Sequence, residues 1–257
     1  MRIVLSIPEV RDALEAHRTG STIGLVPTMG AFHAGHLSLF AAARAECDVV
    51  VCSLFVNPPQ FAERSDLASY PTDEARDHEL AEEAGVDLLF APPAEEMYPA
   101  GFQTWVDVTE LGSILEGAFR PGHFRGVATV CLKLFNIVRP HRAYFGQKDA
   151  QQVEVIRRLV RDLDLEIVLH VLPTLRDGDG LALSSRNSLL TPEERLHALA
   201  LPRALATRDP ERARTELDGL EVDYVEVAPF DPPVLAAAIR VGRTRLIDNV
   251  PLEGAAT

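Results

Sequence analysis

The segment Pro27-Thr28-Met29-Gly30-Ala31-Phe32-His33-Ala34-Gly35-His36 stands between two apolar stretches of the chain. The stretch before it, residues 22–26, is a short apolar run that predicts a buried β-strand. The stretch after it, residues 37–45, predicts a helix. The segment therefore places glycines and two histidines where a strand passes into a helix.

This strand-to-helix junction suits an anion such as a phosphate. Small residues let the backbone approach the anion, and the helix N-terminus offers free N–H groups and the positive end of its dipole. Gly30 and Gly35 suit a tight turn, and His33 and His36, three residues apart, are expected on the same side of the first helical turn. The segment is neither the Gly-Lys-Ser/Thr phosphate loop nor the Gly-x-Gly-x-x-Gly fingerprint. The alternatives are two surface histidines or a metal pair, but zinc needs further ligands and none lies nearby in the sequence.

The composition is that of an ordinary globular protein, with 257 residues, 47% hydrophobic and 25% charged. This length allows a large α/β domain and a smaller one. A net charge of −13 argues against nucleic acid as a partner, but it leaves a small anionic substrate open. The three cysteines form no disulfide framework, so we expect a reducing, cytoplasmic location, with Cys47 and Cys52 in the core. No apolar run suits a signal peptide or a membrane span.

A second apolar strand, residues 48–55, is expected to be buried on both faces. It ends in the loop Val56-Asn57-Pro58-Pro59-Gln60-Phe61. Because ligands of open parallel sheets bind at the carboxyl ends of strands, Asn57 and Gln60 are candidates for recognising a polar substrate. Their spacing alone favours ordinary hydrogen bonding within the loop.

Further elements follow along the chain. We expect a helix over residues 72–85, a strand over 86–93, a basic, glycine-punctuated loop over 116–126, an apolar helix over 127–138 and a buried strand over 165–172. Between the last two, Gly146 turns the chain and Lys148 stands beside the next helix start, where an ammonium group can serve as a point charge for a phosphate. A solvated surface lysine is the alternative.

The loop over residues 176–187 contains Asp-Gly repeats, which are typical of flexible turns. Its two serines and Arg186 form a suitable clamp for a polyphosphate. Thr191, Pro192 and Glu194 then predict a helix that opens with a capping box. The composition shifts near this point, so we expect a catalytic domain over residues 1–187 and a small α+β domain over residues 188–257.

Six stretches of the sequence together resemble the pantothenate synthetase (pantoate–β-alanine ligase) family, of the nucleotidyltransferase superfamily with a His-x-Gly-His signature. They are PTMGAFHAGH, SLFVNPPQF, RPGHFRGVATVCLKLFNIVRP, YFGQKDAQQ, DGLALSSRN and VGRTRLIDN, in the order that the family shows. The resemblance implies a Rossmann-like, doubly wound parallel sheet with a small C-terminal α+β domain, assembled as a homodimer. It implies ATP-dependent condensation of (R)-pantoate with β-alanine through pantoyl adenylate, releasing AMP and pyrophosphate. The product serves pantothenate and coenzyme A biosynthesis, and Mg²⁺ would accompany ATP.

The resemblance also implies roles for particular residues. His36 would be the catalytic histidine, and His33 and Lys148 would act with it on the phosphates. Gln60 would contact both pantoate and β-alanine, and Gln152 and Asn57 would contact pantoate. Apart from the resemblance, Asp77 is one candidate for an acid near Mg²⁺, and a solvated helix carboxylate is the stronger alternative. The residues implied in ATP binding are Met29, Gly30, His33, Gly35, His36, Gly146, Gln147, Lys148, Asp149, Leu175, Leu183, Ser184, Ser185 and Arg186.

The chain departs from the family pattern at four places. Gln147 and Leu183 stand where the family usually has Glu and Met, and Thr72 stands where it usually has Arg. The segment between Leu190 and Val222 is noticeably shorter than usual. Two other interpretations therefore stay open: another His-x-Gly-His adenylyltransferase, which would need a more basic acceptor site, and a nucleotide-binding relative without catalysis.

Overall fold

The computed structural model describes residues 1–61, 67–68 and 70–252. The chain forms two compact units, and each is described by itself below. One unit comprises Met1–Phe145 and Val155–Leu172, and the other comprises Gly146–Glu154 and the chain from Pro173 onward. The domain boundary expected at residue 187 stays a prediction.

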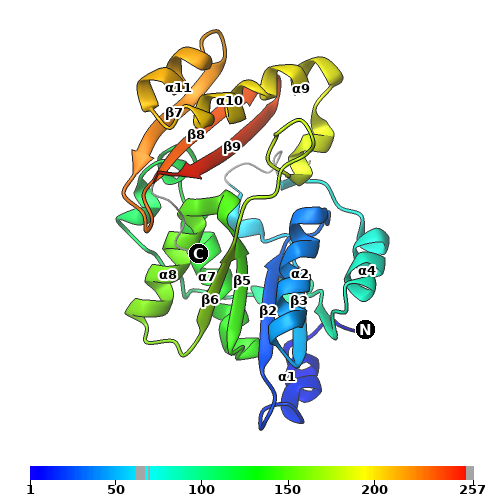
Figure 1. Ribbon diagram of the computed structural model, residues 1–257. Helices are drawn as coiled ribbons and strands as arrows, with labels where there is room; N and C mark the ends of the chain where they lie inside the picture. The colour runs from blue at the N-terminus through cyan, green and yellow to red at the C-terminus, as the bar shows by residue number, and fades with distance from the viewer. Residues whose placement is uncertain (62–66, 69, 253–257) are drawn as a thin grey trace. The chain divides into compact units, whose positions relative to one another are not determined.

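Six of the described strands form one sheet in the order β1-β4-β3-β2-β5-β6 (Figure 1). Their bounds are Arg2–Val4 for β1, Ile23–Thr28 for β2, Val49–Leu54 for β3, Leu88–Phe90 for β4, Arg142–Gly146 for β5 and Val168–Leu172 for β6. The pairings of β1 with β4, β4 with β3, β3 with β2 and β2 with β5 are all parallel. The chain reverses its direction across the sheet between β2 and β5, which makes this the doubly wound arrangement that the sequence predicts.

Helices cover both faces of β2 and β3. The helices in the described part of the first unit are α1 (Ile7–Glu15), α2 (Ala34–Glu46), α4 (Glu74–Glu83), α5 (Ala94–Met97), α6 (Glu116–Phe119) and α7 (His123–Val138). A further helix, α8 (Ala150–Asp162), has its first residues assigned to the second unit and the rest to the first. α2 packs against β2, β3 and α4, whereas α7 packs against β2 and α1. Val26 and Cys52 join Phe40 of α2 in one cluster, and Leu25 and Val51, which alternate with them, are fully buried as well. Two-sided burial explains why both strands read as continuous apolar runs.

Most of the segment over residues 116–126 is helical, where the sequence favours a loop. α6 begins at Glu116, and α7 begins at His123 rather than at Val127. Glycine disfavours helix, but a Cβ atom on Gly126 would lie 2.6 Å from the backbone nitrogen of Gln60. Gly126 therefore has a packing reason that the local sequence does not reveal: it lets α7 approach the short 3-10 helix η1 (Pro58–Gln60).

Two further expectations are corrected in detail. β6 begins at Val168 and lies at the sheet edge, where Val168 is 58% exposed, so it is not the buried strand expected over residues 165–172. The helix expected from residue 72 begins at Glu74, because Asp73 caps it by accepting the N–H of Arg76 at 3.1 Å.

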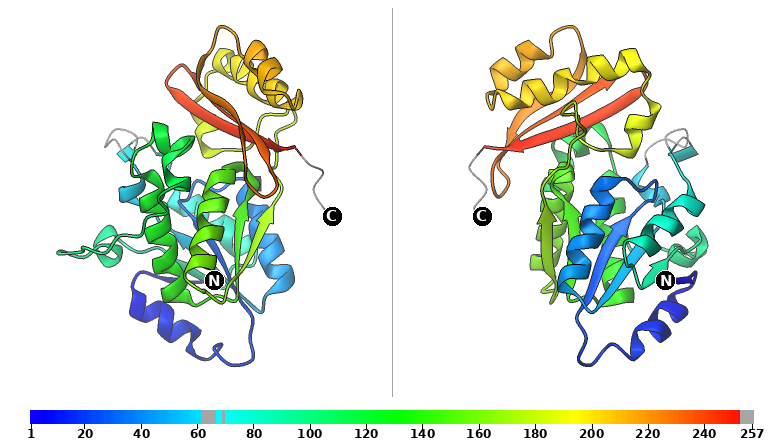
Figure 2. Two further views of the ribbon diagram at one scale, coloured as in Figure 1. Left: turned by 90° about the vertical axis from the view of Figure 1, so that its left-hand side faces the viewer. Right: turned by 45° about the vertical axis from the view of Figure 1, so that its right-hand side comes forward.

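The second unit contains an antiparallel sheet of three described strands in the order β7-β8-β9. Its elements are η3 (Gln147–Asp149), η4 (Ser185–Leu189), α9 (Pro192–Ala198), α10 (Ala200–Ala206), α11 (Pro210–Glu216), β7 (Glu221–Ala228), β8 (Val234–Val241) and β9 (Thr244–Pro251). α10 packs against β8 and β9, and α11 packs against β7 (Figure 2). α9 begins with the predicted capping box of Thr191 and Glu194. The small α+β part of the predicted fold is therefore confirmed.

The three cysteines, Cys47, Cys52 and Cys131, are free and buried, as expected of core residues. Burial raises the pKa of the Cys52 and Cys131 thiols to about 12, so both stay protonated at neutral pH. Within the described residues, no helix is both long enough and apolar enough to cross a membrane.

Candidate active site

The loop between β2 and α2 makes a tight turn in which two consecutive residues have positive φ angles. Gly30 has φ +90° and Ala31 has φ +53°. A Cβ atom on Gly30 would lie 2.8 Å from Oδ2 of Asp77, so this position requires glycine for both its conformation and its space. The turn brings His33 to the N-cap of α2.

Asp77 of α4 anchors this loop. Its Oδ2 accepts the N–H of Ala31 at 2.8 Å, and its Oδ1 accepts the N–H of Phe32 at 2.6 Å. Asp77 is only 2% exposed, so its interpretation as a solvated carboxylate is wrong. Burial raises the pKa of its carboxyl, and the two backbone N–H groups oppose that shift. Asp77 is thus a buried acceptor that holds two consecutive peptide groups of the loop.

His33 and His36 form a capping box at the first turn of α2. Nδ1 of His33 accepts the N–H of Gly35 at 3.1 Å, and Nδ1 of His36 accepts the N–H of His33 at 3.3 Å. The ring centroids lie 4.2 Å apart, as expected for two side chains on the same side of the turn. Because both Nδ1 atoms act as acceptors, each neutral ring carries its proton on Nε2. The pair therefore places two imidazole rings beside a helix N-terminus.

Asn57 and Gln60 are joined in a buried chain of amide contacts. Asn57 is 1% exposed, and its Nδ2 donates to Oε1 of Gln60 and to the carbonyl oxygen of Gly126, both at 3.1 Å. Its Oδ1 accepts the hydroxyl of Tyr98 at 2.7 Å. Nε2 of Gln60 in turn donates to Sδ of Met29 at 2.8 Å. Both N–H donors of Asn57 are thus used within the protein, which favours a role in orienting Gln60.

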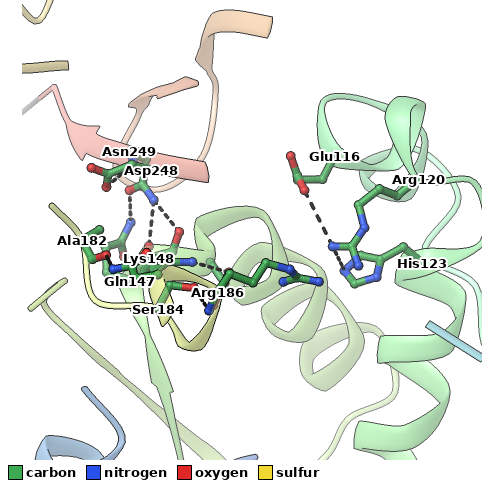
Figure 3. A network of polar contacts seen from close by, with 12 residues as sticks. Glu116, Arg120, His123, Gln147, Lys148, Ala182, Ser184, Arg186, Asp248 and Asn249 are labelled. Carbon is green, nitrogen blue, oxygen red and sulfur yellow. Dashed lines mark hydrogen bonds and ion pairs between the residues drawn. The ribbon is translucent and has the colours of Figure 1, made fainter. Parts of the chain in front are cut away.

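A polar row to which the sequence assigns no role contains Glu116 of α6, Arg120 directly after α6, and His123 at the start of α7 (Figure 3). Nδ1 of His123 lies 2.8 Å from the carbonyl oxygen of Gln60, and Nη1 of Arg120 lies 3.2 Å from Nε2 of His123. Arg120 also pairs with Glu116 at 3.8 Å. The row supports the backbone at Gln60. In the sequence, Arg120 and His123 stand in the family-like stretch that begins RPGHFRG, within a segment predicted as a basic loop.

In the second unit, η3 follows Gly146 and leads into α8. Nζ of Lys148 lies 3.6 Å from Oδ1 of Asp149, and the Lys148 side chain is 20% exposed. The carbonyl oxygens of Gln147 and Lys148 both accept hydrogen bonds from Nδ2 of Asn249, at 3.0 and 2.9 Å. Most of the Lys148 side chain is therefore covered, unlike that of a solvated surface lysine.

The loop over residues 176–187, expected to be flexible, has its two ends joined by hydrogen bonds. The N–H of Leu183 donates to the carbonyl oxygen of Leu175 at 2.9 Å. Oγ of Ser184 accepts the N–H of Arg186 at 3.3 Å, which caps η4 at its first turn. Between these ends, the carboxylates of Asp177 and Asp179 accept hydrogen bonds from Arg195.

Each unit contains part of the predicted site. In the first unit these residues are Met29, Gly30, His33, Gly35, His36, Asn57 and Gln60. In the second unit they are Gly146, Gln147, Lys148, Asp149, Gln152, Leu175, Leu183, Ser184, Ser185 and Arg186. Across the described part of the chain, no group of three or more His, Cys, Asp and Glu side chains is arranged to hold a metal ion.

Comparison with known proteins identifies the family. The family profile described as pantoate-beta-alanine ligase matches residues 2–251. The chain is 51% identical to the pantothenate synthetase of Moorella thermoacetica over 280 aligned positions, covering 98% of this chain and 99% of that protein. It is 52% identical to the pantothenate synthetase of Heliobacterium modesticaldum, covering 98% and 100%. Alignments longer than the 257 residues of this chain mean that these relatives carry residues that it lacks.

Solved structures agree with this result. The crystal structure of pantothenate synthetase from Thermus thermophilus superposes with a TM-score of 0.92 at 45% identity, covering 98% of this chain and 99% of that one. Pantoate-beta-alanine ligase from Francisella tularensis, solved in complex with beta-gamma ATP and beta-alanine, superposes with a TM-score of 0.89 at 35% identity, and the match covers both chains completely. The chain therefore belongs to the pantoate-beta-alanine ligase family.

Proposed function

We propose that this protein condenses (R)-pantoate with β-alanine and cleaves ATP to AMP and pyrophosphate. The observation that carries the proposal is the His33–His36 pair, held at the N-terminus of α2 directly after β2, in a chain of this family. Two of the three substrates, ATP and β-alanine, are named for the Francisella relative. A small carboxylic acid as the third substrate agrees with the amide-rich Asn57–Gln60 loop.

In the first step, a carboxylate oxygen of pantoate attacks the α-phosphorus of ATP. The new bond joins this oxygen to phosphorus, and the bond from phosphorus to the oxygen bridging to the β-phosphate breaks, so that pyrophosphate leaves. Negative charge builds up on the phosphate oxygens. His33, His36 and Lys148 would stabilise this charge, together with the N–H groups of the first turn of α2.

In the second step, the amine of β-alanine attacks the acyl carbon of pantoyl adenylate. A C–N bond forms, the bond from carbon to the phosphate oxygen breaks, AMP leaves, and the amine nitrogen loses a proton. The protein contributes mainly the positioning of the two reactants. Gln60, held by Asn57, would orient both pantoate and β-alanine, and Gln152 would contact pantoate.

Further residues of each unit are proposed to contact ATP. Met29, Gly30 and Gly35 would contact ATP through the loop that Asp77 anchors. Gly146, Gln147 and Asp149 would contact ATP, with Asp149 at the ribose, and Leu175 would meet adenine through its backbone. Leu183, Ser184, Ser185 and Arg186 would close over the phosphates and exclude water, which protects the acyl adenylate from hydrolysis.

Magnesium is proposed to enter with ATP, held mainly by phosphate oxygens and water. The chain fits this arrangement, because both oxygens of Asp77 already accept backbone N–H groups. The ion would neutralise phosphate charge.

We also propose a cytoplasmic location, which suits the three free cysteines. A homodimer is proposed from the resemblance, and light scattering of the purified protein tests it.

The test is pyrophosphate release from ATP in the presence of pantoate, with AMP and pantothenate forming once β-alanine is added. His36→Ala is expected to lower pyrophosphate release by about 10²–10³-fold, typical of the loss of one preorganised donor. The matched control is His197→Ala, which removes an exposed histidine of α9 and should leave the rate unchanged. Near-normal turnover of His36→Ala would remove His36 from the mechanism. Wild-type protein without pantoate-dependent release would refute the proposed function.

A further inference from the structure

The segment Arg245-Leu246-Ile247-Asp248-Asn249 of β9 belongs to a stretch typical of the family, yet it has no role in the proposed mechanism. Asp248 and Asn249 are 2% and 4% exposed. Buried polar side chains in a strand need hydrogen-bond partners. The partners of these two residues lie in two other segments of the same unit, both proposed to contact ATP.

Asn249 clamps the segment that carries Lys148 (Figure 3). Its Nδ2 donates to the carbonyl oxygens of Gln147 and Lys148, at 3.0 and 2.9 Å. These oxygens belong to the two peptide planes that flank the Cα atom of Lys148. Because each peptide group is rigid, fixing both planes fixes the direction in which the Lys148 side chain leaves the backbone.

Gln147 completes the clamp from the other side. Its Nε2 donates to Oδ1 of Asn249 at 3.2 Å, while its own backbone carbonyl oxygen accepts from Nδ2 of Asn249. This contact gives Gln147 a function in a position where the family usually has Glu. The glutamine supplies the donor that Oδ1 of Asn249 needs once both of its N–H groups are used.

Asp248 holds the second segment. Its carboxylate accepts two hydrogen bonds from Arg176, from Nη1 at 2.6 Å and from Nη2 at 3.1 Å, and it also accepts the N–H of Asn249 at 2.8 Å. Arg176 donates further to the carbonyl oxygen of Gly180 at 3.2 Å. The paired geometry is the strong, directional kind. It secures the start of the loop that continues to Ser184.

We propose that Asn249 is a positioning residue that directs Lys148 toward ATP, and that Asp248 beside it holds the loop leading to Ser184, Ser185 and Arg186. Two adjacent residues of β9 would thus hold in place two segments of one unit, both of which are proposed to bind phosphate. The inference rests on the proposed function, which supplies ATP as the ligand. Neither Asp248 nor Asn249 needs to touch ATP for this role.

The test is a double-mutant cycle of Asn249→Ala and Lys148→Ala, with ATP affinity measured by calorimetry and kcat/KM for ATP measured by pyrophosphate release. Asn249→Ala is expected to lower the ATP affinity and the kcat/KM for ATP by about 10- to 100-fold each, the usual cost of a misplaced binding group. Asn249→Asp should be worse, because it turns an oxygen toward two carbonyl oxygens. In the Lys148→Ala background, Asn249→Ala should cause little further loss.

The matched control lies in the same sheet. Asp223 of β7 pairs with Arg245 of β9 at 2.6 Å, away from the clamp, so Asp223→Asn removes an ion pair of this sheet without touching η3. It should lower the melting temperature and leave ATP affinity unchanged. If Asp223→Asn weakens ATP binding as much as Asn249→Ala does, or if the losses from Asn249→Ala and Lys148→Ala simply add, the inference falls.

The design separates this inference from the proposed function. Wild-type protein that binds ATP but releases no pyrophosphate with pantoate refutes the function, and the affinity cycle alone then decides the role of Asn249. Wild-type protein that does not bind ATP overturns both. Non-additive losses of ATP affinity, together with an unaffected Asp223→Asn control, support the inference.

Discussion

Substituting Asp77 by asparagine separates the activity of this protein from its stability. In the wild-type protein the carboxylate accepts one N–H from Ala31 and one from Phe32. An asparagine of the same size keeps one acceptor oxygen, but its NH₂ group then faces the second N–H. One of the two loop contacts is therefore lost and replaced by a repulsive one.

The magnitude follows from the kind of bond. A hydrogen bond to a charged group contributes about 1.5–3 kcal/mol, and each 1.36 kcal/mol of transition-state stabilisation is a factor of about ten in rate. If the loop holds His33 and His36 in place, Asp77→Asn should lower kcat/KM for ATP by about 10- to 100-fold. The chemical groups on ATP and on the histidines are unchanged by the substitution.

Stability should respond differently. Burial raises the pKa of Asp77 above its ordinary value of 3.8. Above that pH the carboxyl ionises more readily in the unfolded chain than in the folded protein, so its ionisation lowers the free energy of unfolding. Asparagine removes this cost as well as one hydrogen bond, and the two effects oppose each other. We therefore expect the free energy of unfolding of Asp77→Asn to stay within about 1 kcal/mol of wild type.

The control comes from the same helix. Asp73 caps α4 through the N–H of Arg76, so Asp73→Ala should lower the free energy of unfolding by about 1 kcal/mol and leave activity unchanged. Pyrophosphate release at varied ATP and thermal melting of both variants check this. If Asp77→Asn keeps kcat/KM within about twofold of wild type, the loop does not depend on Asp77. Equal activity losses in both variants would refute the reasoning by tracing the effect to the helix as a whole.

Two other residues give simpler tests. Tyr98→Phe removes the hydroxyl group that donates to Oδ1 of Asn57. The loss of roughly 1 kcal/mol of hydrogen bonding should raise the KM for pantoate about fivefold and leave the KM for ATP unchanged. Equal changes in both KM values would contradict an orienting role for Asn57. Glu46 has its pKa lowered, chiefly by the hydrogen bond from Arg142, so its stabilisation is present above the ordinary pKa of 4.5 and is lost as pH falls through the folded-state value. The melting temperature of Glu46→Gln should therefore fall less steeply on acidification than that of wild type, and identical slopes would contradict this.

The parts of the fold that follow from local pattern could be predicted. β2, β3 and α2 lie where the apolar runs place them, and the capping box at Thr191 and Glu194 begins a helix. These features depend on residues close together in the sequence. The start of α7 could not be predicted in the same way. Gly126 argues against a helix locally, but it is needed for close packing against the backbone of Gln60, 66 positions earlier in the chain.

The same limit applies to the candidate site. Residues proposed to touch substrate stand in short motifs such as His-x-Gly-His, and pattern and resemblance are what propose them. The residues that hold those motifs act across long separations: Asp77 is 46 positions from Ala31, and Asn249 is 101 positions from Lys148. Periodicity indicates which face of a helix or strand is buried, but it does not indicate a partner. The local sequence therefore makes Asp77 resemble a solvated carboxylate, whereas its contacts across the fold make it a buried acceptor.

Asp77 and Asn249 solve one physical problem with opposite chemistry. A loop that leaves a parallel strand has no ladder to satisfy its peptide groups, and unpaired peptide groups away from water are costly. Asp77 supplies two acceptors to consecutive N–H groups, and Asn249 supplies two donors to consecutive carbonyl groups. Because size and burial are shared and only hydrogen-bond polarity differs, Asp77→Asn and Asn249→Asp should each harm ATP use more than their effect on folding would suggest. Asn249→Ala should harm ATP use less than Asn249→Asp. Alanine leaves the two carbonyl groups able to bind a water molecule, whereas the aspartate oxygen would repel them.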